Sequence, residues 1–260
     1  MPALARTSSV VLQDIHADVW HAHALSDAPL QVQPTGHMEL DGQLPGGGWP
    51  WGALTEILQP TGVHSEWRLL LPALARCGQQ AVLLVGTPHL PFAPALAAQG
   101  LQAQRLVCAQ APSAVTRLWA CEQALRCADV DAVLAWLPQA RGDQLRRLQM
   151  AASEYNKLLF VMCPAAAQDD ASPAVLRLHV QPQAPHQHRR PFSALPASPA
   201  RATALPTFPE PVHDGLRLHL LKRRGPPLET PLHLQARTAR LCMQLAASRS
   251  YALDCATTRA

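Results

Sequence analysis

The chain has 260 residues, of which 48% are hydrophobic, and carries a formal net charge of +4. This length accommodates one sizeable α/β domain with appendages, or two small domains. The weakly basic balance is compatible with nucleic acid or with an acidic protein partner and does not decide between them. Asp14 and Asp18 interrupt the first apolar stretch, which argues against a signal peptide, and no apolar run has the length of a membrane span. We therefore expect a cytoplasmic protein without a membrane segment.

The seven cysteines form no Cys-x-x-Cys pair and stand mostly among apolar residues. This distribution favours reduced thiols that serve as small core residues over a zinc or redox motif. The twelve histidines have no neighbouring cysteine or carboxylate pattern that is typical of a metal site. We expect no bound metal.

Residues 1–33 are predicted to form a short helix followed by irregular chain. Ser8 or Ser9 can cap this helix, and prolines interrupt the stretch from 26 to 50. The helix either packs on the core or docks on another protein, and the irregular stretch gives it the reach for docking.

Strand-length apolar runs and amphipathic helices alternate through residues 34–181. Strands are expected at 53–58, 81–86, 104–110, 131–137 and 157–163, and helices at 66–77, at 93–99, after Ser113 and at 143–156. This alternation predicts an α/β fold with a mostly parallel sheet and helices on both faces. Pro72 is expected to bend the first helix or to mark its true start. In the helix that Ser113 caps, Val115 and Leu118 follow the helical period of the apolar face.

The composition changes after residue 181. Residues 182–213 contain a proline every few positions, which predicts a mobile linker. Strand-like alternation at 174–180 and 215–225 predicts two paired strands at the sheet edge, with the linker between them. Residues 214–260 are thus expected to hold an edge strand and a basic C-terminal helix.

The stretch GALTEILQPTGVHSEWRLLL, residues 52–71, has the strand–loop–helix order of a phosphate-binding P-loop. A working loop follows G-x-x-x-x-G-K-[ST], in which backbone N–H groups and the lysine hold phosphates and the hydroxyl holds magnesium. The stretch resembles the RecA family in register. The resemblance places Gln59 and His64 at the two glycines, Ser65 at the lysine and Glu66 at the hydroxyl.

Two further positions depart from the RecA pattern. Pro88 stands where a catalytic glutamate is expected, and Ala135 and Trp136 stand where a magnesium-linked aspartate is expected. The loss of lysine, metal ligand and base predicts a RecA-like fold that is not an enzyme and binds no cofactor. An active ATPase or recombinase is the alternative. The degenerate P-loop comprises Gln59, Pro60, Thr61, Gly62, His64, Ser65 and Glu66.

Several segments between residues 34 and 225 resemble the ImuA family, RecA-related proteins encoded with SOS mutagenesis polymerases. The most specific are LPGGGWP, residues 44–50, and LKRRG, residues 221–225. The resemblance implies a non-catalytic accessory role in SOS-induced, error-prone translesion DNA synthesis. The implied partners are an ImuB-like homologue of Y-family polymerases and an error-prone replicative-type polymerase complex, with RecA and a weak DNA contact as further candidates.

Residues 69–163 also resemble SulA, the SOS inhibitor of bacterial cell division. This resemblance gives an alternative function, inhibition of the tubulin-like division GTPase. The glycine-rich entry and the basic exit strand are similar to ImuA and not to SulA.

Two groups of residues are candidates for partner binding. The first group comprises Gly46, Gly47, Gly48, Trp49 and Trp51. These residues form either a loop that docks on a partner or a tight turn whose tryptophans pack over the sheet. The second comprises Lys222, Arg223 and Arg224. These three either keep an edge strand from pairing with other chains or contact phosphates or an acidic partner.

Overall fold

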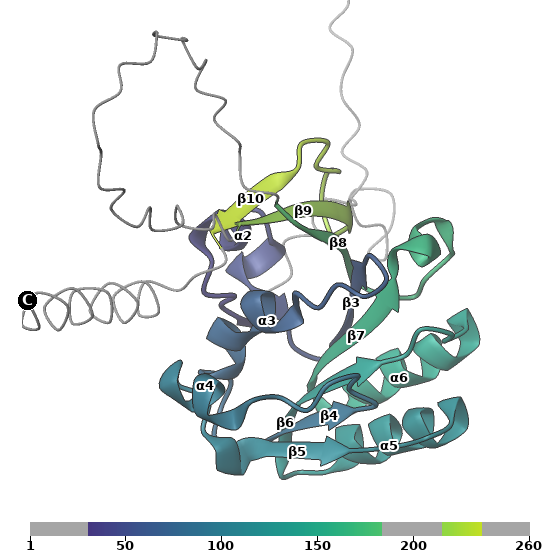
Figure 1. Ribbon diagram of the computed structural model, residues 1–260. Helices are drawn as coiled ribbons and strands as arrows, with labels where there is room; N and C mark the ends of the chain where they lie inside the picture. Colours follow the sequence, from purple (N-terminus) through teal and green to yellow (C-terminus); the bar gives the residue numbers. More distant parts are fainter. Residues whose placement is uncertain (1–30, 184–214, 236–260) are drawn as a thin grey trace, which may run out of the picture.

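The computed structural model describes residues 31–183 and 215–235. The predicted N-terminal helix, proline-rich linker and C-terminal basic helix lie outside these residues. The described part contains an eight-stranded sheet with the spatial order β10-β9-β8-β3-β7-β6-β4-β5 (Figure 1). Its strands are β3 (Ala53–Gln59), β4 (Ala81–Val85), β5 (Leu106–Ala109), β6 (Val130–Trp136), β7 (Leu158–Pro164), β8 (Leu176–Pro182), β9 (Gly215–Lys222) and β10 (Leu232–Gln235). The strands from β8 to β5 in this order are parallel, and β9 and β10 are antiparallel to their neighbours.

Helices cover both faces of the sheet, as the sequence predicts. On one face lie α2 (Met38–Asp41), α3 (Glu66–Leu74) and α4 (Ala93–Ala98), and on the other lie α5 (Ala114–Arg126) and α6 (Gly142–Tyr155) (Figure 1). Each face has its own apolar core, the first around Leu70 and Phe160 and the second around Leu125 and Leu148. Three short 3-10 helices complete the connections: η2 (Pro45–Gly47), η3 (Ala103–Arg105) and η4 (Ala165–Asp169).

The central strand β3 is buried at all seven positions, including the charged Glu56. Arg177 of β8 pairs with this carboxylate, with 2.5 Å between Nε and Oε2. The other guanidinium nitrogens of Arg177 donate to the carbonyls of Ala167, Gln168 and Asp170 at 2.8 to 3.1 Å. All three nitrogens of the buried guanidinium therefore donate hydrogen bonds, and the pair fastens β8 and η4 to the centre of the sheet.

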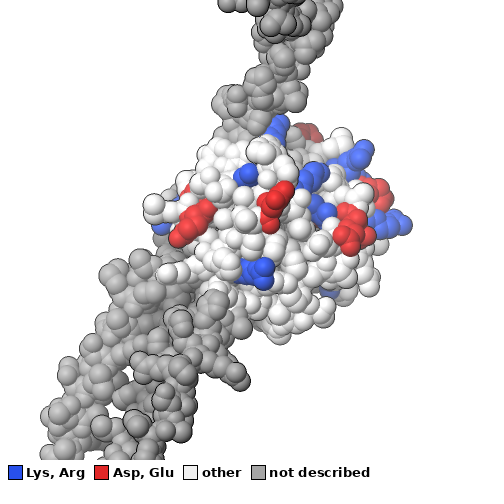
Figure 2. All heavy atoms as spheres, turned by 90° about the horizontal axis from the view of Figure 1, so that it is seen from above, with Lys and Arg blue, Asp and Glu red and all other residues white. Residues whose placement is uncertain are grey.

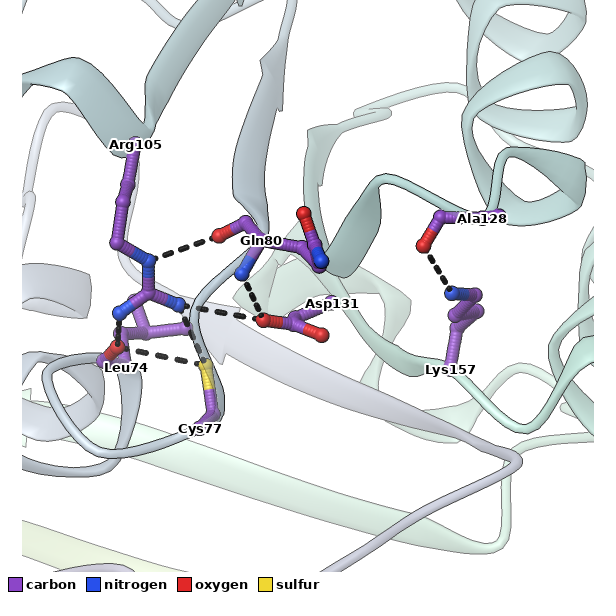
Figure 3. Close-up of polar contacts among 7 residues, drawn as sticks. All are labelled: Leu74, Cys77, Gln80, Arg105, Ala128, Asp131 and Lys157. Carbon is purple, nitrogen blue, oxygen red and sulfur yellow. Dashed lines mark hydrogen bonds and ion pairs between the residues drawn. The ribbon is translucent and has the colours of Figure 1, made fainter.

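A second buried arginine closes the amino-terminal end of the sheet (Figure 3). Arg105 donates to the carbonyl of Gln80 at 2.8 Å and to that of Leu74 at 3.3 Å. Its guanidinium also lies 3.5 Å from the carboxylate of Asp131, which accepts the Gln80 N–H at 2.7 Å. One side chain thus connects the end of α3 with the starts of β4, β5 and β6.

The predicted strands and helices of the core are confirmed to within a few residues at their ends. Ser113 caps α5, and its hydroxyl accepts the Thr116 N–H at 3.1 Å. Pro72 neither starts α3 nor ends it, since the helix begins at Glu66. Because proline has no N–H, Pro72 removes one i→i−4 hydrogen bond near the end of the helix. Val115 was expected on the apolar face and is instead 74% exposed.

The predicted pair of strands at 174–180 and 215–225 is confirmed as β8 and β9. Their ladder continues to the N–H of Gln183, which donates to the carbonyl of Gly215 at 2.8 Å. The expectation that this pair forms the sheet edge is wrong, because β10 pairs with β9 outside it. The stretch that was expected to be irregular also contains a small two-stranded sheet of β1 (Val32–Gln33) and β2 (Trp49–Pro50).

Candidate functional site

A cavity of about 340 Å³ lies at the carboxyl ends of β3, β4, β6 and β7. In open parallel sheets this end is where ligands bind. The cavity is lined by the loop from Gln59 to His64 and also by Pro88 and Trp136. The structure therefore brings together the loop from Gln59 to His64, Pro88 and Trp136, the positions to which the resemblance to RecA assigns the phosphate loop, the base and the metal ligand.

The side chain of Gln59 satisfies the backbone at the start of α3. Its Oε1 accepts the Ser65 N–H at 2.7 Å, and its Nε2 donates to Glu66 Oε2 at 3.1 Å. In a P-loop, N–H groups at this helix start would point at a phosphate. Here an amide oxygen of the chain itself takes up one of them.

Glu66 adds a buried negative charge at the same place, with 3% of its side chain exposed. A carboxylate in the first turn interacts favourably with the helix dipole. His64 Nδ1 lies 3.6 Å from its Oε1, and the ring of His89 stacks edge-on against His64 at 4.9 Å between centroids. The arrangement offers a carboxylate where a triphosphate needs donors and cations.

The side chains of Arg117 and Cys163 also line the cavity. Arg117 is held by its Nε, which donates to the Ala111 carbonyl at 2.8 Å, and it lies against Gly86. Gly86 has a φ of 66°, in the left-handed region that residues with a side chain rarely adopt, so glycine is favoured there. Burial, together with the charge of Glu56, raises the pKa of the Cys163 thiol to about 12. This cysteine is therefore protonated at neutral pH and is a poor nucleophile.

The two groups of candidate partner-binding residues meet at one corner of the molecule. Arg223 donates from Nη1 to the carbonyl of Gln43, just before the glycine-rich loop, and from Nε to that of Pro226 at 2.9 Å. Lys222 donates to the Ser172 carbonyl at 3.0 Å. Two of the three basic side chains therefore hold backbone carbonyls of their own chain, a role that the sequence did not suggest, while Arg224 is exposed.

The glycine-rich loop is a tight turn, with Gly46 and Gly47 in the left-handed region at φ of 77° and 79°. At Gly48 a Cβ would lie 2.3 Å from the Gln33 carbonyl oxygen. Trp49 is fully buried and packs edge-on against Phe160, with ring centroids 5.5 Å apart. Its ring is not accessible to a partner, in agreement with the turn interpretation, and Trp51 packs partly buried against the same core.

Charged groups are mixed on the surface. On the face shown in Figure 2, lysine and arginine side chains alternate with aspartate and glutamate and form no single basic field. Among the described residues, no cluster of three or more His, Cys, Asp or Glu side chains could hold a metal ion. In the same part of the chain, no helix has the length and apolar character needed to cross a bilayer.

The sequence reasoning missed the buried pair of Glu56 and Arg177 and the network of Arg105. The charge of Glu56 inside a strand of otherwise uncharged residues was the available signal. Its partner is 121 positions away in the chain. Periodicity alone cannot give such a pairing.

Two proteins found by comparison with known proteins carry the same name. The chain is 35% identical over 112 residues to the cell division inhibitor SulA of Photorhabdus laumondii, covering 42% of this chain and 63% of that protein. It is 30% identical over 132 residues to the cell division inhibitor SulA of Yersinia enterocolitica, covering 49% of this chain and 79% of that protein. No family model matches the chain. Sequence identity at this level over most of the Yersinia protein shows that the chain belongs to the SulA family.

Proposed function

We propose that this protein acts in the SOS response by binding another protein, without catalysis, and that it inhibits cell division through the tubulin-like division GTPase. The observation that carries the proposal is the relation to two proteins named as cell division inhibitors. The start of α3 supports a binding role. In the loop that the resemblance to RecA assigns to phosphate binding, Gln59 Oε1 accepts the Ser65 N–H and Glu66 presents a buried carboxylate.

The test is controlled overproduction in a bacterial host, with cell length measured by microscopy. We expect long filaments without septa, because an inhibitor of the division GTPase blocks the septum but not growth. A Phe160→Asp variant is the matched control, since a charge at this buried position unfolds the protein. Cells of normal length, at a verified level of soluble wild-type protein, would contradict the proposal.

A second candidate function is an accessory role in translesion DNA synthesis, with an ImuB-like polymerase homologue, an error-prone polymerase complex and RecA as partners. A specific observation favours it. The glycine-rich entry and the basic exit strand, which carry the resemblance to ImuA, lie together in space. Arg223 donates to Gln43, the residue before the entry, and Arg223 and Arg224 line the same cavity as Pro45 and Gly48. A direct DNA contact has less support, because charges of both signs are mixed on the face in Figure 2.

The two functions are separated by a deletion strain and a pull-down. An accessory protein of translesion synthesis is needed for damage-induced mutagenesis, and it retains the ImuB-like protein on an affinity column. Removing residues 214–260 is unsuitable, because β9 supplies Leu216, Leu218 and Leu220 to the core. Arg224→Glu is the better variant, because it reverses the exposed charge and leaves the hydrogen bonds of Lys222 and Arg223 intact. Unchanged mutagenesis in the deletion strain would rule out the second function.

A further inference from the structure

Arg117 of α5 lines two neighbouring cavities. The larger is the cavity of about 340 Å³ at the carboxyl ends of β3, β4, β6 and β7. The smaller, of about 200 Å³, lies between α5 and the turn after β6, residues 137–140, and Gln144 of α6 also lines it. Arg117 and Pro138 belong to both linings, so the two cavities adjoin at the Arg117 side chain.

The guanidinium of Arg117 has unused hydrogen-bond donors. Within residues 31–183 and 215–235, only its Nε donates, to the Ala111 carbonyl at 2.8 Å. By contrast, the guanidinium nitrogens of Arg105 and Arg177 all donate to groups of the chain. Arg117 is half-buried, and its Nη1 and Nη2 therefore remain for a ligand. Two guanidinium nitrogens side by side match the two oxygens of one carboxylate.

The charge of Arg117 is not compensated in these cavities. Among the described residues that line them, Arg117 is the only lysine, arginine, aspartate or glutamate. Glu56 and Glu66, which lie behind the larger cavity, are each 3% exposed and already accept hydrogen bonds from the chain. Beside the smaller cavity, Arg141 pairs with Asp143 at 3.6 Å and adds no net charge. The two cavities thus present one free positive charge to a ligand.

The larger cavity is lined mostly by apolar groups around this charge, among them Val63, Trp136 and Met162. Sites for small molecules are typically clefts of roughly 300–1,000 Å³ with apolar walls and a few polar groups that orient the ligand. A triphosphate fits poorly, because a single guanidinium would face several negative charges next to the buried carboxylate of Glu66. A ligand with one carboxylate on an apolar body matches both the walls and the charge.

We propose that these cavities form a binding site for a small organic acid. Its carboxylate accepts two hydrogen bonds from Nη1 and Nη2 of Arg117, and its apolar body lies in the larger cavity against Val63 and Met162. The site is an addition to the protein-binding role proposed above and does not depend on it.

The test titrates the full purified chain with 2-naphthoate and with 2-naphthamide, which has the same rings and no charge. NMR signals of each probe give its Kd at neutral pH. We expect 2-naphthoate to bind with a Kd of about 1 mM or tighter, as ligand efficiency gives for a probe of this size. It should bind about tenfold more tightly than 2-naphthamide, because only the carboxylate makes charge-assisted hydrogen bonds.

Three variants locate the probe. Arg117→Met should weaken 2-naphthoate about tenfold and leave 2-naphthamide unchanged, since it removes the charged hydrogen bonds and keeps the alkyl chain. Val63→Trp narrows the larger cavity and should weaken both probes. The matched control is Arg126→Met, because Arg126 is exposed on the same helix and lines neither cavity. It should leave both Kd values unchanged, and circular dichroism confirms that each variant is folded.

Equal affinity for the two probes, or no binding of 2-naphthoate, would overturn the proposal. An effect of Arg126→Met as large as that of Arg117→Met would show a nonspecific charge effect, and an unchanged affinity in Val63→Trp would exclude the larger cavity. Displacement of 2-naphthoate by ATP would assign the site to phosphates instead. The titration needs no partner protein, so the outcome of the filamentation test does not affect it.

Discussion

Substitution of Arg177 by methionine should destabilise the whole sheet. The change removes the cation 2.5 Å from Glu56 and leaves that carboxylate buried with 3% of its side chain exposed. It also removes the donors to the carbonyls of Ala167, Gln168 and Asp170. Breaking a buried ion pair from one side costs about 3–5 kcal/mol, because an uncompensated charge stays in the core. For a chain of this size, that corresponds to a fall in Tm of roughly 6–20 °C.

The assay is urea unfolding followed by circular dichroism, with thermal unfolding as a second measurement. Glu56→Met combined with Arg177→Met should recover much of the loss, since no charge is then buried. Arg147→Met is the control, because the Arg147 side chain is 69% exposed and its pair with Glu122 should therefore contribute only about 1 kcal/mol. A loss below about 1 kcal/mol for Arg177→Met, or a double variant less stable than Arg177→Met, would refute the reasoning.

Three further predictions concern nucleotide, pH and thiol chemistry. Calorimetric titration with magnesium and ATP should show no saturable binding. Micromolar affinity for ATP together with ATP turnover would contradict the interpretation of a degenerate P-loop. Burial lowers the pKa of His37 below its ordinary value of 6.5, so the unfolded chain binds a proton that the folded chain rejects. The free energy of unfolding should therefore fall as the pH drops from about 6.5 through the lowered pKa of the folded state. Urea unfolding of His37→Gln should show a smaller fall in this free energy over the same pH range. An identical pH profile for both proteins would contradict this. Burial raises the pKa of Cys121 to about 12. Iodoacetamide at pH 8, followed by peptide mapping, should therefore modify the exposed Cys108 in the folded protein and Cys121 only after denaturation. Equal rates of modification for the two cysteines in the folded protein would disprove the burial of Cys121.

The parallel core was predictable because its signal is local. Apolar runs such as residues 131–137 are too short for helices and are buried on both faces, and Ser113 marks a helix start by its capping hydroxyl. The short strand β10 was missed. Its four residues come directly after a stretch with Pro226, Pro227 and Pro231, and only the pairing with β9 makes them a strand.

The candidate site was predictable as a place but not as a set of contacts. Alignment with a P-loop predicted the turn between β3 and α3, which the structure confirms. The absence of phosphate-binding residue types from this turn stays a prediction of that alignment. The alignment could not show that the Gln59 side chain turns back to the Ser65 N–H, because side-chain hydrogen bonds in a loop depend on its folded shape. In the same way, an alternation of apolar and basic residues gave the exit strand, while the bond from Arg223 to Gln43 joins positions 180 residues apart.

The last rung of the ladder between β8 and β9 joins Gln183 to Gly215, so the sheet holds these two points of the chain side by side. In general, doubling the length of a loop whose two ends are held together costs only about 0.6 kcal/mol. We therefore expect a change in the length of the connection between these two points to have little effect on the sheet. The same property makes it a suitable insertion point for a reporter domain, because the two anchoring residues already hold the junction together.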